Sequence, residues 1–365
     1  MTTITAEEWN DVLFGAADLE TGPSGGRMPH RIPAGLRRQL DGDAMFEWVE
    51  SCSAGVRMRF RTSADRIALT VASTTLATNG VHPPIALVVR QGDDRSLVPL
   101  GDPTVVEIDA KRRVTGIRPA APETVSVAVR PEQPVEIRLP HNARVELISL
   151  TADGTIEPSP PSGRRWIHYG SSISQGMDAV AADRTWPAAA ASALDWDLRD
   201  LSLAGNAQLD GFVARTIRDT AADIITLKIG VNTVNADSFR ERTFRPALHA
   251  FLDTVRDGHP TTPVVLITAI ACPIHEHSPG PVVARPDGMA AAAIRSIEKD
   301  DGALTLARTR EIIADAVASR GDDALTCIDG RELLGANEAD RLYDRLHPDQ
   351  LGLDLIAERF VAMMR

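Results

Sequence analysis

Cysteine, positive charge and long apolar runs are all scarce in this sequence, and each scarcity argues against a class of protein. The three cysteines, Cys52, Cys272 and Cys327, are far apart and odd in number, which argues against a disulfide framework or a zinc knuckle. We expect all three to be buried as small apolar residues. The 39 basic and 50 acidic residues leave a net charge of −11, and no basic run offsets it, so the sequence predicts no nucleic-acid partner.

Membrane association and secretion also lack a signal. No stretch of the chain is long and apolar enough for a membrane-spanning helix. The opening residues, MTTITAEEWNDVLFG, have neither the basic nor the apolar region of a secretory signal. We therefore expect a cytoplasmic protein without a membrane partner. The sequence leaves the oligomeric state open.

What remains is an ordinary globular composition, with 43% apolar and 24% charged residues. We detect no internal repeat or low-complexity tract. At roughly 150 residues per domain, a chain of 365 residues predicts about two domains.

The first half alternates apolar and polar residues in short segments bounded by turn-forming residues. This pattern is typical of antiparallel strands with one buried face, and it predicts an all-β sandwich of the jelly-roll type over residues 1–160. The expected strands are 56–60, 67–71, 85–89, 124–129 and 145–150. Residues 156–163 contain three prolines, so we expect an extended linker and the domain boundary there.

Residues 164–365 alternate short apolar segments with longer stretches whose apolar residues recur three and four positions apart. Strands that are apolar on both faces and alternate with helices predict a three-layer α/β domain with a doubly wound parallel sheet. The expected strands are 166–169, 198–203, 224–229, 264–270 and 325–328, and the expected helices are 186–194, 211–219, 239–256, 304–318 and 348–364. We expect the last helix to begin with Pro348 at its first position.

Polar residues directly after the predicted strands are the first candidates for a site, because the carboxyl ends of parallel strands meet at one edge of the sheet. The strand at 166–169 is followed by Gly170-Ser171-Ser172-Ile173-Ser174. A serine at the start of the next helix would direct its hydroxyl to this edge, beside free backbone N–H groups. The alternative is a cluster of serines that only caps the helix.

Two further strand ends carry glycine and asparagine. Gly205 follows the strand at 198–203, and Gly230 and Asn232 follow the strand at 224–229. A glycine N–H and an asparagine amide are donors of the kind that stabilise an oxyanion. Ordinary turns between a strand and a helix are the alternative for each.

The last candidate is Asp344-Arg345-Leu346-His347, just before the terminal helix. A carboxylate three residues before a histidine can accept a hydrogen bond from its Nδ1–H and leave Nε2 to accept a proton. Pro348 disfavours a helical conformation at His347 and keeps this residue outside the helix. The alternative is a solvent-exposed cap at the helix start.

Together, the four segments resemble the four sequence blocks of the SGNH hydrolases, also called the GDSL-like lipase/acylhydrolase family. The resemblance covers roughly residues 164–365 and implies the flavodoxin-like fold of that family. It implies a catalytic set composed of Ser172 as nucleophile, His347 as general base and Asp344 as orienting acid, with an oxyanion hole formed by the Ser172 N–H, the Gly205 N–H and the Asn232 side chain.

One position departs from the family pattern. The family usually has Asp before the nucleophile, where this chain has Ser171, and we interpret this as a subfamily feature. The Gly-x-Ser-x-Gly elbow of the α/β-hydrolases is not matched either, because Ser174 stands where that elbow has its second glycine. The sequence therefore favours the SGNH family over the α/β-hydrolases.

The N-terminal half resembles, in its architecture, the sandwich of two-domain bacterial carbohydrate esterases that remove acetyl groups. We therefore expect a serine esterase that hydrolyses short-chain acyl esters, with acetyl preferred, of a small glycosylated or polyhydroxy substrate. No cofactor or metal is expected. Acyl transfer from the same acyl-enzyme and a non-catalytic carbohydrate-binding protein are the alternatives.

Other polar residues receive weaker assignments. The segment Cys272-Pro273-Ile274-His275-Glu276-His277 contains metal-ligand residue types, but its spacing matches no standard zinc pattern. We expect this segment to form a wall of the substrate cleft. Among the remaining histidines, we expect His30 and His259 to be surface or capping residues.

Overall fold

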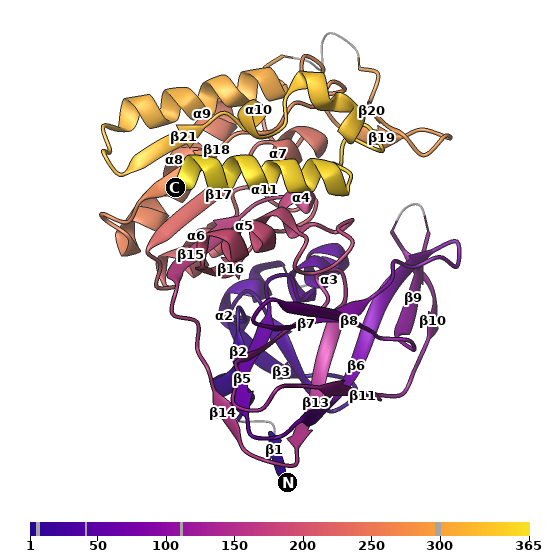
Figure 1. Cartoon of the computed structure of the whole chain (residues 1–365). Helices are drawn as coiled ribbons and strands as arrows, with labels where there is room; N and C mark the ends of the chain where they lie inside the picture. Colours follow the sequence, from indigo (N-terminus) through magenta and orange to yellow (C-terminus); the bar gives the residue numbers. More distant parts are fainter. Residues whose placement is uncertain (5–7, 41, 110–111, 296–300) are drawn as a thin grey trace. The chain divides into compact units, whose positions relative to one another are not determined.

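The computed structural model describes residues 1–4, 8–40, 42–109, 112–295 and 301–365 (Figure 1). The described chain divides into two compact units. The first contains Met1–Ser162 together with Ala181–Asp183, and the second contains Gly163–Val180 and Arg184–Arg365. Each unit has its own cluster of buried apolar side chains.

Two β-sheets form the first unit. In the described residues, the larger sheet has the order β10-β9-β6-β13-β4-β3, with β1 also paired to β13 and β11 to β6. The smaller sheet has the order β14-β5-β12-β7-β8, with β2 also paired to β5. The elements of this unit are β1 (Thr2–Ile4), α1 (Trp9–Val12), β2 (Leu13–Phe14), β3 (Asp18–Thr21), β4 (Arg27–His30), α2 (Ala34–Arg37), η1 (Arg38–Leu40), α3 (Ala44–Ser51), β5 (Arg57–Thr62), β6 (Arg66–Thr78), β7 (Ala86–Gln91), β8 (Asp94–Pro99), β9 (Thr104–Ile108), β10 (Val114–Arg118), β11 (Glu123–Ala128), β12 (Val135–Arg138), β13 (Arg144–Ala152) and β14 (Ile156–Pro158).

Alternating side chains along the strands build the core of this unit. In β6, every second residue from Ile67 to Ala77 is buried, as expected for a strand with one face in the core. Leu69 of the larger sheet shares a single buried cluster with Met58 and Ile137 of the smaller sheet. One face of each sheet therefore contributes to a common core, and the all-β N-terminal region expected from the sequence is confirmed.

The expectation of a linker over residues 156–163 is wrong for its first residues. β14 pairs antiparallel with β5, placing Ile156 opposite Thr62 and Pro158 opposite Phe60. Ile156 also packs against the core. Proline is tolerated here because β14 is the edge strand of its sheet, where a missing N–H donor need not break a ladder on both sides.

A parallel sheet forms the second unit, with the strand order β16-β15-β17-β18-β21. In chain order this is 2-1-3-4-5, the order of flavodoxin-like folds. The elements of this unit are β15 (Arg164–Tyr169), α4 (Ser172–Gln175), α5 (Trp186–Leu194), β16 (Trp196–Asp200), α6 (Gly211–Arg218), β17 (Ile224–Lys228), α7 (Val231–Asn235), α8 (Glu241–Gly258), β18 (Val264–Ile267), β19 (Val282–Ala284), β20 (Ala290–Ala292), α9 (Leu306–Arg320), β21 (Leu325–Ile328), α10 (Gly330–Leu333), η3 (Ala336–Arg341) and α11 (Gln350–Met364).

Two residues of β15 show how helices cover the sheet. Trp166 stacks on Phe360 of α11 and contacts Trp186 of α5. Tyr169 stacks on Phe251 of α8. Because Trp166 and Tyr169 point to opposite faces of the strand, α5 and α11 cover one face of the sheet and α8 covers the other (Figure 1). The predicted three-layer doubly wound sheet is confirmed.

Two predicted strands end too late in the sequence. β16 ends at Asp200 and β18 at Ile267, each three residues before its expected end. Leu203 and Ile270 are nevertheless fully buried. The apolar run therefore marks burial in the core, which continues after the sheet hydrogen bonds stop.

Two local expectations are also wrong. Pro348 is not the first residue of α11, because Asp349 caps this helix and accepts a hydrogen bond from the Gly352 N–H (2.8 Å). Cys52 and Cys272 are buried as expected, but Cys327, on the edge strand β21, is exposed. Among the described residues, no helix combines the length and the hydropathy needed to cross a membrane.

Candidate active site

Ser172 is the first residue of α4, the short helix that follows β15. The turn into the helix is tight: a Cβ added at Gly170 would lie 2.3 Å from Ser174 Oγ, so a larger residue does not fit there. Ser171 is the N-cap, and its hydroxyl accepts a hydrogen bond from the Ile173 N–H (3.3 Å). The capping alternative therefore applies to Ser171 and leaves the Ser172 hydroxyl available. Serine and aspartate are both good N-caps, so Ser171 can cap the helix as an aspartate would.

The Ser172 hydroxyl meets the imidazole of His347. Ser172 Oγ lies 2.9 Å from His347 Nε2, and His347 Nδ1 lies 2.7 Å from Asp344 Oδ2. Asp344 Oδ1 accepts hydrogen bonds from the backbone N–H groups of His347 (2.6 Å) and Leu346 (2.9 Å). Arg345 has a φ of 74°, which turns the chain so that the carboxylate folds back on the imidazole. The structure thus brings Ser172, His347 and Asp344 together in the arrangement of a serine-histidine-acid triad.

Electrostatics favour an ionised Asp344 beside a basic His347. Burial would raise the pKa of Asp344, but its hydrogen bonds with the His347 side chain and with backbone amides lower this pKa to about 2. Burial would likewise lower the pKa of His347. The hydrogen bond and charge of Asp344 and the charge of Asp178 outweigh burial, so the pKa of His347 is raised above its ordinary value. A more basic imidazole accepts the serine proton more readily.

We expect esterase activity to fall on acidification, with a midpoint above 6.5, the ordinary pKa of histidine. Only the neutral imidazole can accept the serine proton, and the raised pKa makes protonation begin at a higher pH. Replacing Asp178 with asparagine removes a negative charge that stabilises the imidazolium, so the acid limb should move to lower pH. Profiles of kcat/KM against pH for p-nitrophenyl acetate measure this shift.

The control for this shift is Asp219→Asn, which removes an exposed carboxylate that pairs with Arg218 at the end of α6. Its profile should match that of the wild type. An acid limb that stays in place in Asp178→Asn would contradict the contribution assigned to Asp178.

Hydrogen bonds connect the loops of Gly205 and Asn232 to the nucleophile turn. Gln175 of α4 accepts a hydrogen bond at Oε1 from the Ala204 N–H (2.8 Å), and Asn232 Oδ1 accepts one from the Ala207 N–H (3.1 Å). The side-chain oxygen of Asn232 is thus engaged in a hydrogen bond, and the Nδ2 group remains as the side-chain donor. The assignment of Gly205 and Asn232 as oxyanion donors stays a prediction. Sequence reasoning missed Gln175, although it lies only three residues after Ser172.

Gly230 is the residue that allows α7 to begin where it does. Its φ is 112°, a conformation that disfavours other residues, and a Cβ added there would lie 2.8 Å from Thr309 Cγ2. Thr233 Oγ1 donates a hydrogen bond to the Gly230 carbonyl (2.7 Å) and fixes the first turn of the helix. These contacts position Asn232, which is buried.

Sequence reasoning also missed a buried polar network beneath the nucleophile turn. The Trp186 indole donates to Ser174 Oγ (3.2 Å), and the Trp166 indole donates to Thr226 Oγ1 (2.8 Å). His168 Nδ1 lies 2.6 Å from the same Thr226 oxygen. The only sequence signal for this network is the presence of His168 and Thr226 within strands that are otherwise apolar.

The segment 272–277 supports the turn that carries the acid and base. Cys272 Sγ lies 3.5 Å from the Arg345 carbonyl oxygen, and Glu276 pairs with the buried Arg310 (2.6 Å). Part of the segment lines a cavity of about 370 Å³, whose walls are Pro273, Ile274, Ala339, Leu342 and Arg345. Within the part of the chain that the structure describes, no group of three or more His, Cys, Asp or Glu side chains is placed to hold a metal ion.

Residues 168–355 match the model of the GDSL-like lipase/acylhydrolase family, which is just over half of the 365-residue chain. The matched region contains every residue of the candidate site, namely Ser172, Gly205, Asn232, Asp344 and His347. No curated protein sequence matches the chain.

Solved structures match the whole chain. A salicylyl-acyltransferase, SsfX3, from a tetracycline biosynthetic pathway is 24% identical, with a TM-score of 0.80, over 100% of this chain and 96% of that one. A family two carbohydrate esterase from Cellvibrio japonicus is 15% identical, with a TM-score of 0.59, over 100% of this chain and 97% of that one. An acetyl xylan esterase, Est2A, from the rumen bacterium Butyrivibrio proteoclasticus is 11% identical, with a TM-score of 0.55, over 100% of this chain and 98% of that one. These structures share the fold, and the family model matches more than half of the chain: the chain belongs to the GDSL-like lipase/acylhydrolase family and is a carboxylic ester hydrolase.

Proposed function

We propose that the chain hydrolyses short-chain acyl esters, preferably acetyl esters, of a small glycosylated or polyhydroxy substrate through an acyl-enzyme on Ser172. The observation that carries this proposal is the pair of contacts from Ser172 Oγ to His347 Nε2 (2.9 Å) and from His347 Nδ1 to Asp344 Oδ2 (2.7 Å). A serine paired with an oriented base is how proteins activate a hydroxyl nucleophile. The alternative of a non-catalytic carbohydrate-binding protein is set aside, because the chain belongs to a family of acylhydrolases.

The proposed reaction has two halves. In the first, His347 Nε2 accepts the hydroxyl proton of Ser172 while Oγ bonds to the acyl carbon, and oxyanion donors stabilise the resulting negative charge. The alcohol then leaves with the proton held by His347, and the acyl group remains on Ser172. In the second half, His347 accepts a proton from water as the water oxygen attacks the acyl carbon, and the proton returns to Ser172 as the acid leaves. Asp344 keeps the imidazole in its Nδ1–H tautomer throughout.

Support for a sugar ester as substrate comes from two of the structural relatives. They are described as a family two carbohydrate esterase and an acetyl xylan esterase, and both match 100% of this chain, including its all-β N-terminal region. We extend the chemistry that those names describe to this chain, with acetyl as the preferred acyl group.

Acyl transfer through the same acyl-enzyme is the second candidate. The observation that favours it is the TM-score of 0.80 with a salicylyl-acyltransferase over the whole chain. Hydrolysis and transfer share the first half-reaction and differ in whether water or another acceptor reaches the acyl-enzyme. We propose hydrolysis first, and the 24% exposure of the His347 side chain supports it because water can reach the general base.

One experiment tests both candidates. The protein is mixed with p-nitrophenyl acetate and quenched, and its intact mass is measured. We expect one added acetyl group, mapped to Ser172, that is absent from Ser172→Ala and retained in Ser192→Ala, a control serine on α5 that donates to the Ala188 carbonyl. Repeating the reaction with a sugar or an amine distinguishes acetate, the product of hydrolysis, from an acetylated acceptor. A protein that neither turns over nor gains an acetyl group would contradict both candidates.

Replacing Asn232 with alanine is expected to lower kcat by about 10²- to 10³-fold with little change in KM, because an oxyanion donor acts mainly in the transition state. The substitution also removes Asn232 Oδ1, which accepts a hydrogen bond from the Ala207 N–H. Asn232→Asp is therefore the matched variant, since it keeps an oxygen for Ala207 but provides no donor. A kcat near that of the wild type in Asn232→Asp would exclude the side-chain amide as an oxyanion donor.

A further inference from the structure

A cavity of about 350 Å³ lies in the first unit, among residues that the catalytic site does not use. Strands β3, β4 and β13 and helices α2 and α3 contribute to it. Its walls include Glu20, His30, Arg37, Glu47, Glu50 and Arg144. Binding cavities for small molecules start at about 300 Å³, so a compact molecule fits this volume.

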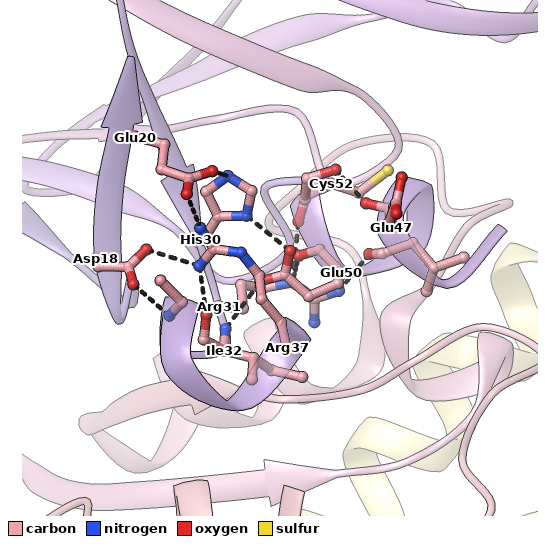
Figure 2. Close-up of polar contacts among 12 residues, drawn as sticks. Asp18, Glu20, His30, Arg31, Ile32, Arg37, Glu47, Glu50 and Cys52 are labelled. Carbon is pink, nitrogen blue, oxygen red and sulfur yellow. Dashed lines mark hydrogen bonds and ion pairs between the residues drawn. The ribbon is translucent and has the colours of Figure 1, made fainter. Parts of the chain in front are cut away.

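The carboxylates of Glu20 and Glu50 already have partners (Figure 2). Glu50 is buried, with Oε2 at 2.7 Å from His30 Nδ1 and Oε1 accepting a hydrogen bond from the Ile32 N–H (2.9 Å). Glu20 lies 3.2 Å from His30 Nε2 and 2.7 Å from Arg37. The expectation of a surface or capping role for His30 is therefore wrong, since the side chain is buried between two carboxylates.

Arg31 fixes the helix that forms one wall of the cavity. Its buried guanidinium donates to the carbonyl oxygens of Val49 (2.5 Å), Glu50 (3.1 Å) and Cys52 (2.9 Å), at the end of α3 (Figure 2). These are carbonyl groups that a helix terminus leaves without a partner inside the helix. The cavity wall is thus held by charge-assisted hydrogen bonds before any ligand is present.

Arg144 is a partly buried arginine in the cavity wall. Its guanidinium lies 4.7 Å from the centre of the Trp48 ring, and it makes no hydrogen bond or ion pair within the described part of the chain. The Nε atom is buried. Burial lowers the pKa of Arg144, and the charges of Glu50 and Glu47 only partly oppose this effect. A buried donor without an acceptor is destabilising. The unpaired Nε of Arg144 therefore indicates an acceptor that the chain itself does not supply.

We propose that the cavity binds a small organic carboxylate, whose two oxygens take hydrogen bonds from the guanidinium of Arg144. An arginine presents its donors as a planar fork that matches a carboxylate. Trp48, packed against that plane, holds the fork in one orientation. Arg38, which is exposed and forms no ion pair among the described residues, adds a second positive charge without an ion-pair partner to the lining.

The charge of the walls limits the ligand to a single negative charge. Glu20, Glu47 and Glu50 all line the cavity and would repel a doubly charged group such as a phosphate. A monocarboxylate places its charge on Arg144 and its remaining atoms against the apolar part of the lining, which includes Met28 and Phe46.

Titration of the full-length protein with sodium benzoate or inorganic phosphate, at constant ionic strength, tests the proposal. The readout is the indole N–H signal of Trp48 in a ¹H–¹⁵N spectrum, assigned with Trp48→Phe, because this group reports on Arg144 and not on the catalytic site. We expect a saturable shift with benzoate, a weaker response to phosphate, and a loss of affinity of about tenfold or more in Arg144→Met. Hydrolysis of p-nitrophenyl acetate should be unchanged in that variant.

Arg164→Met is the matched control, because Arg164 also stacks on a tryptophan, Trp196, but lies exposed in the second unit. It should leave the benzoate titration unchanged. Arg144→Met keeps the apolar stem over Trp48 and removes a partly buried charge that has no ion-pair partner in the described chain, so its Tm should equal or exceed that of the wild type. Three results would each overturn the proposal: no saturable shift with benzoate, tighter binding of phosphate than of benzoate, or a lower Tm in Arg144→Met together with an unchanged titration.

Discussion

Replacing Ser172 with alanine is expected to lower kcat for p-nitrophenyl acetate by a factor on the order of 10⁶, the size of effect seen when a serine hydrolase loses its nucleophile. The substitution removes the oxygen that lies 2.9 Å from His347 Nε2, so no acyl-enzyme can form. Folding should be unaffected, because Ser171 and not Ser172 caps α4, and alanine is a good helix former. Steady-state kinetics and a thermal melt measure the two properties separately.

Ser171→Ala is the matched control in the same turn. It removes the hydroxyl that accepts the Ile173 N–H, so it should lower stability by about 1 kcal/mol while the nucleophile remains. We expect this variant to keep a large share of its turnover, and Ser171→Asp, the usual residue of the family at this position, to regain the cap. If Ser172→Ala remained as active as Ser171→Ala, the covalent mechanism would be wrong.

The candidate catalytic residues could be predicted from sequence because two of the three lie close together in the chain. Asp344 and His347 are three residues apart, and a single turn, with Arg345 in the left-handed region, is enough to bring them into contact. Ser172 follows a strand that was recognisable from its apolar residues. The only long-range step needed was that the carboxyl ends of parallel strands meet at one edge of the sheet.

Charges that act through space were not predictable in the same way. Asp178 raises the pKa of His347 from a loop far away in the sequence, and no spacing rule connects the two residues. The cluster around His30 and Glu50 has the same origin, since a strand and a helix meet there only after the chain has folded. The amino-acid types of His30 and Glu50 alone suggest solvent-exposed positions, although both side chains are buried.

Strand ends and pairings were harder to predict than strand existence, for a related reason. An apolar run records that side chains are buried, as at Leu203 and Ile270, but not whether the backbone still pairs with a neighbour. Conversely, Ile156–Pro158 forms a strand although the three prolines of residues 156–163 favour an extended linker, because β5 offers it an open edge. Pairing depends on partners that a local window of sequence does not contain.

Asp344→Asn is expected to lower kcat by about 10⁴-fold, which is the second-largest effect after loss of the nucleophile. Asp344 Oδ1 accepts hydrogen bonds from the backbone N–H groups of Leu346 and His347, so an asparagine would turn its own oxygen toward them. Its NH₂ group would then face His347 Nδ1, where the structure has a carboxylate oxygen at 2.7 Å. A donor in that position favours the tautomer with the proton on Nε2, which cannot accept the proton of Ser172.

The contrast with Asp178→Asn separates this tautomer effect from a simple loss of charge. Both substitutions remove a negative charge that raises the pKa of His347, so both should move the acid limb of the pH profile to lower pH. Only Asp344→Asn reverses the hydrogen bond at Nδ1, so only this variant should also lose activity at the pH where His347 is fully neutral. Equal plateau rates for the two variants would show that Asp344 acts through its charge alone, and the orienting role assigned to it would be wrong.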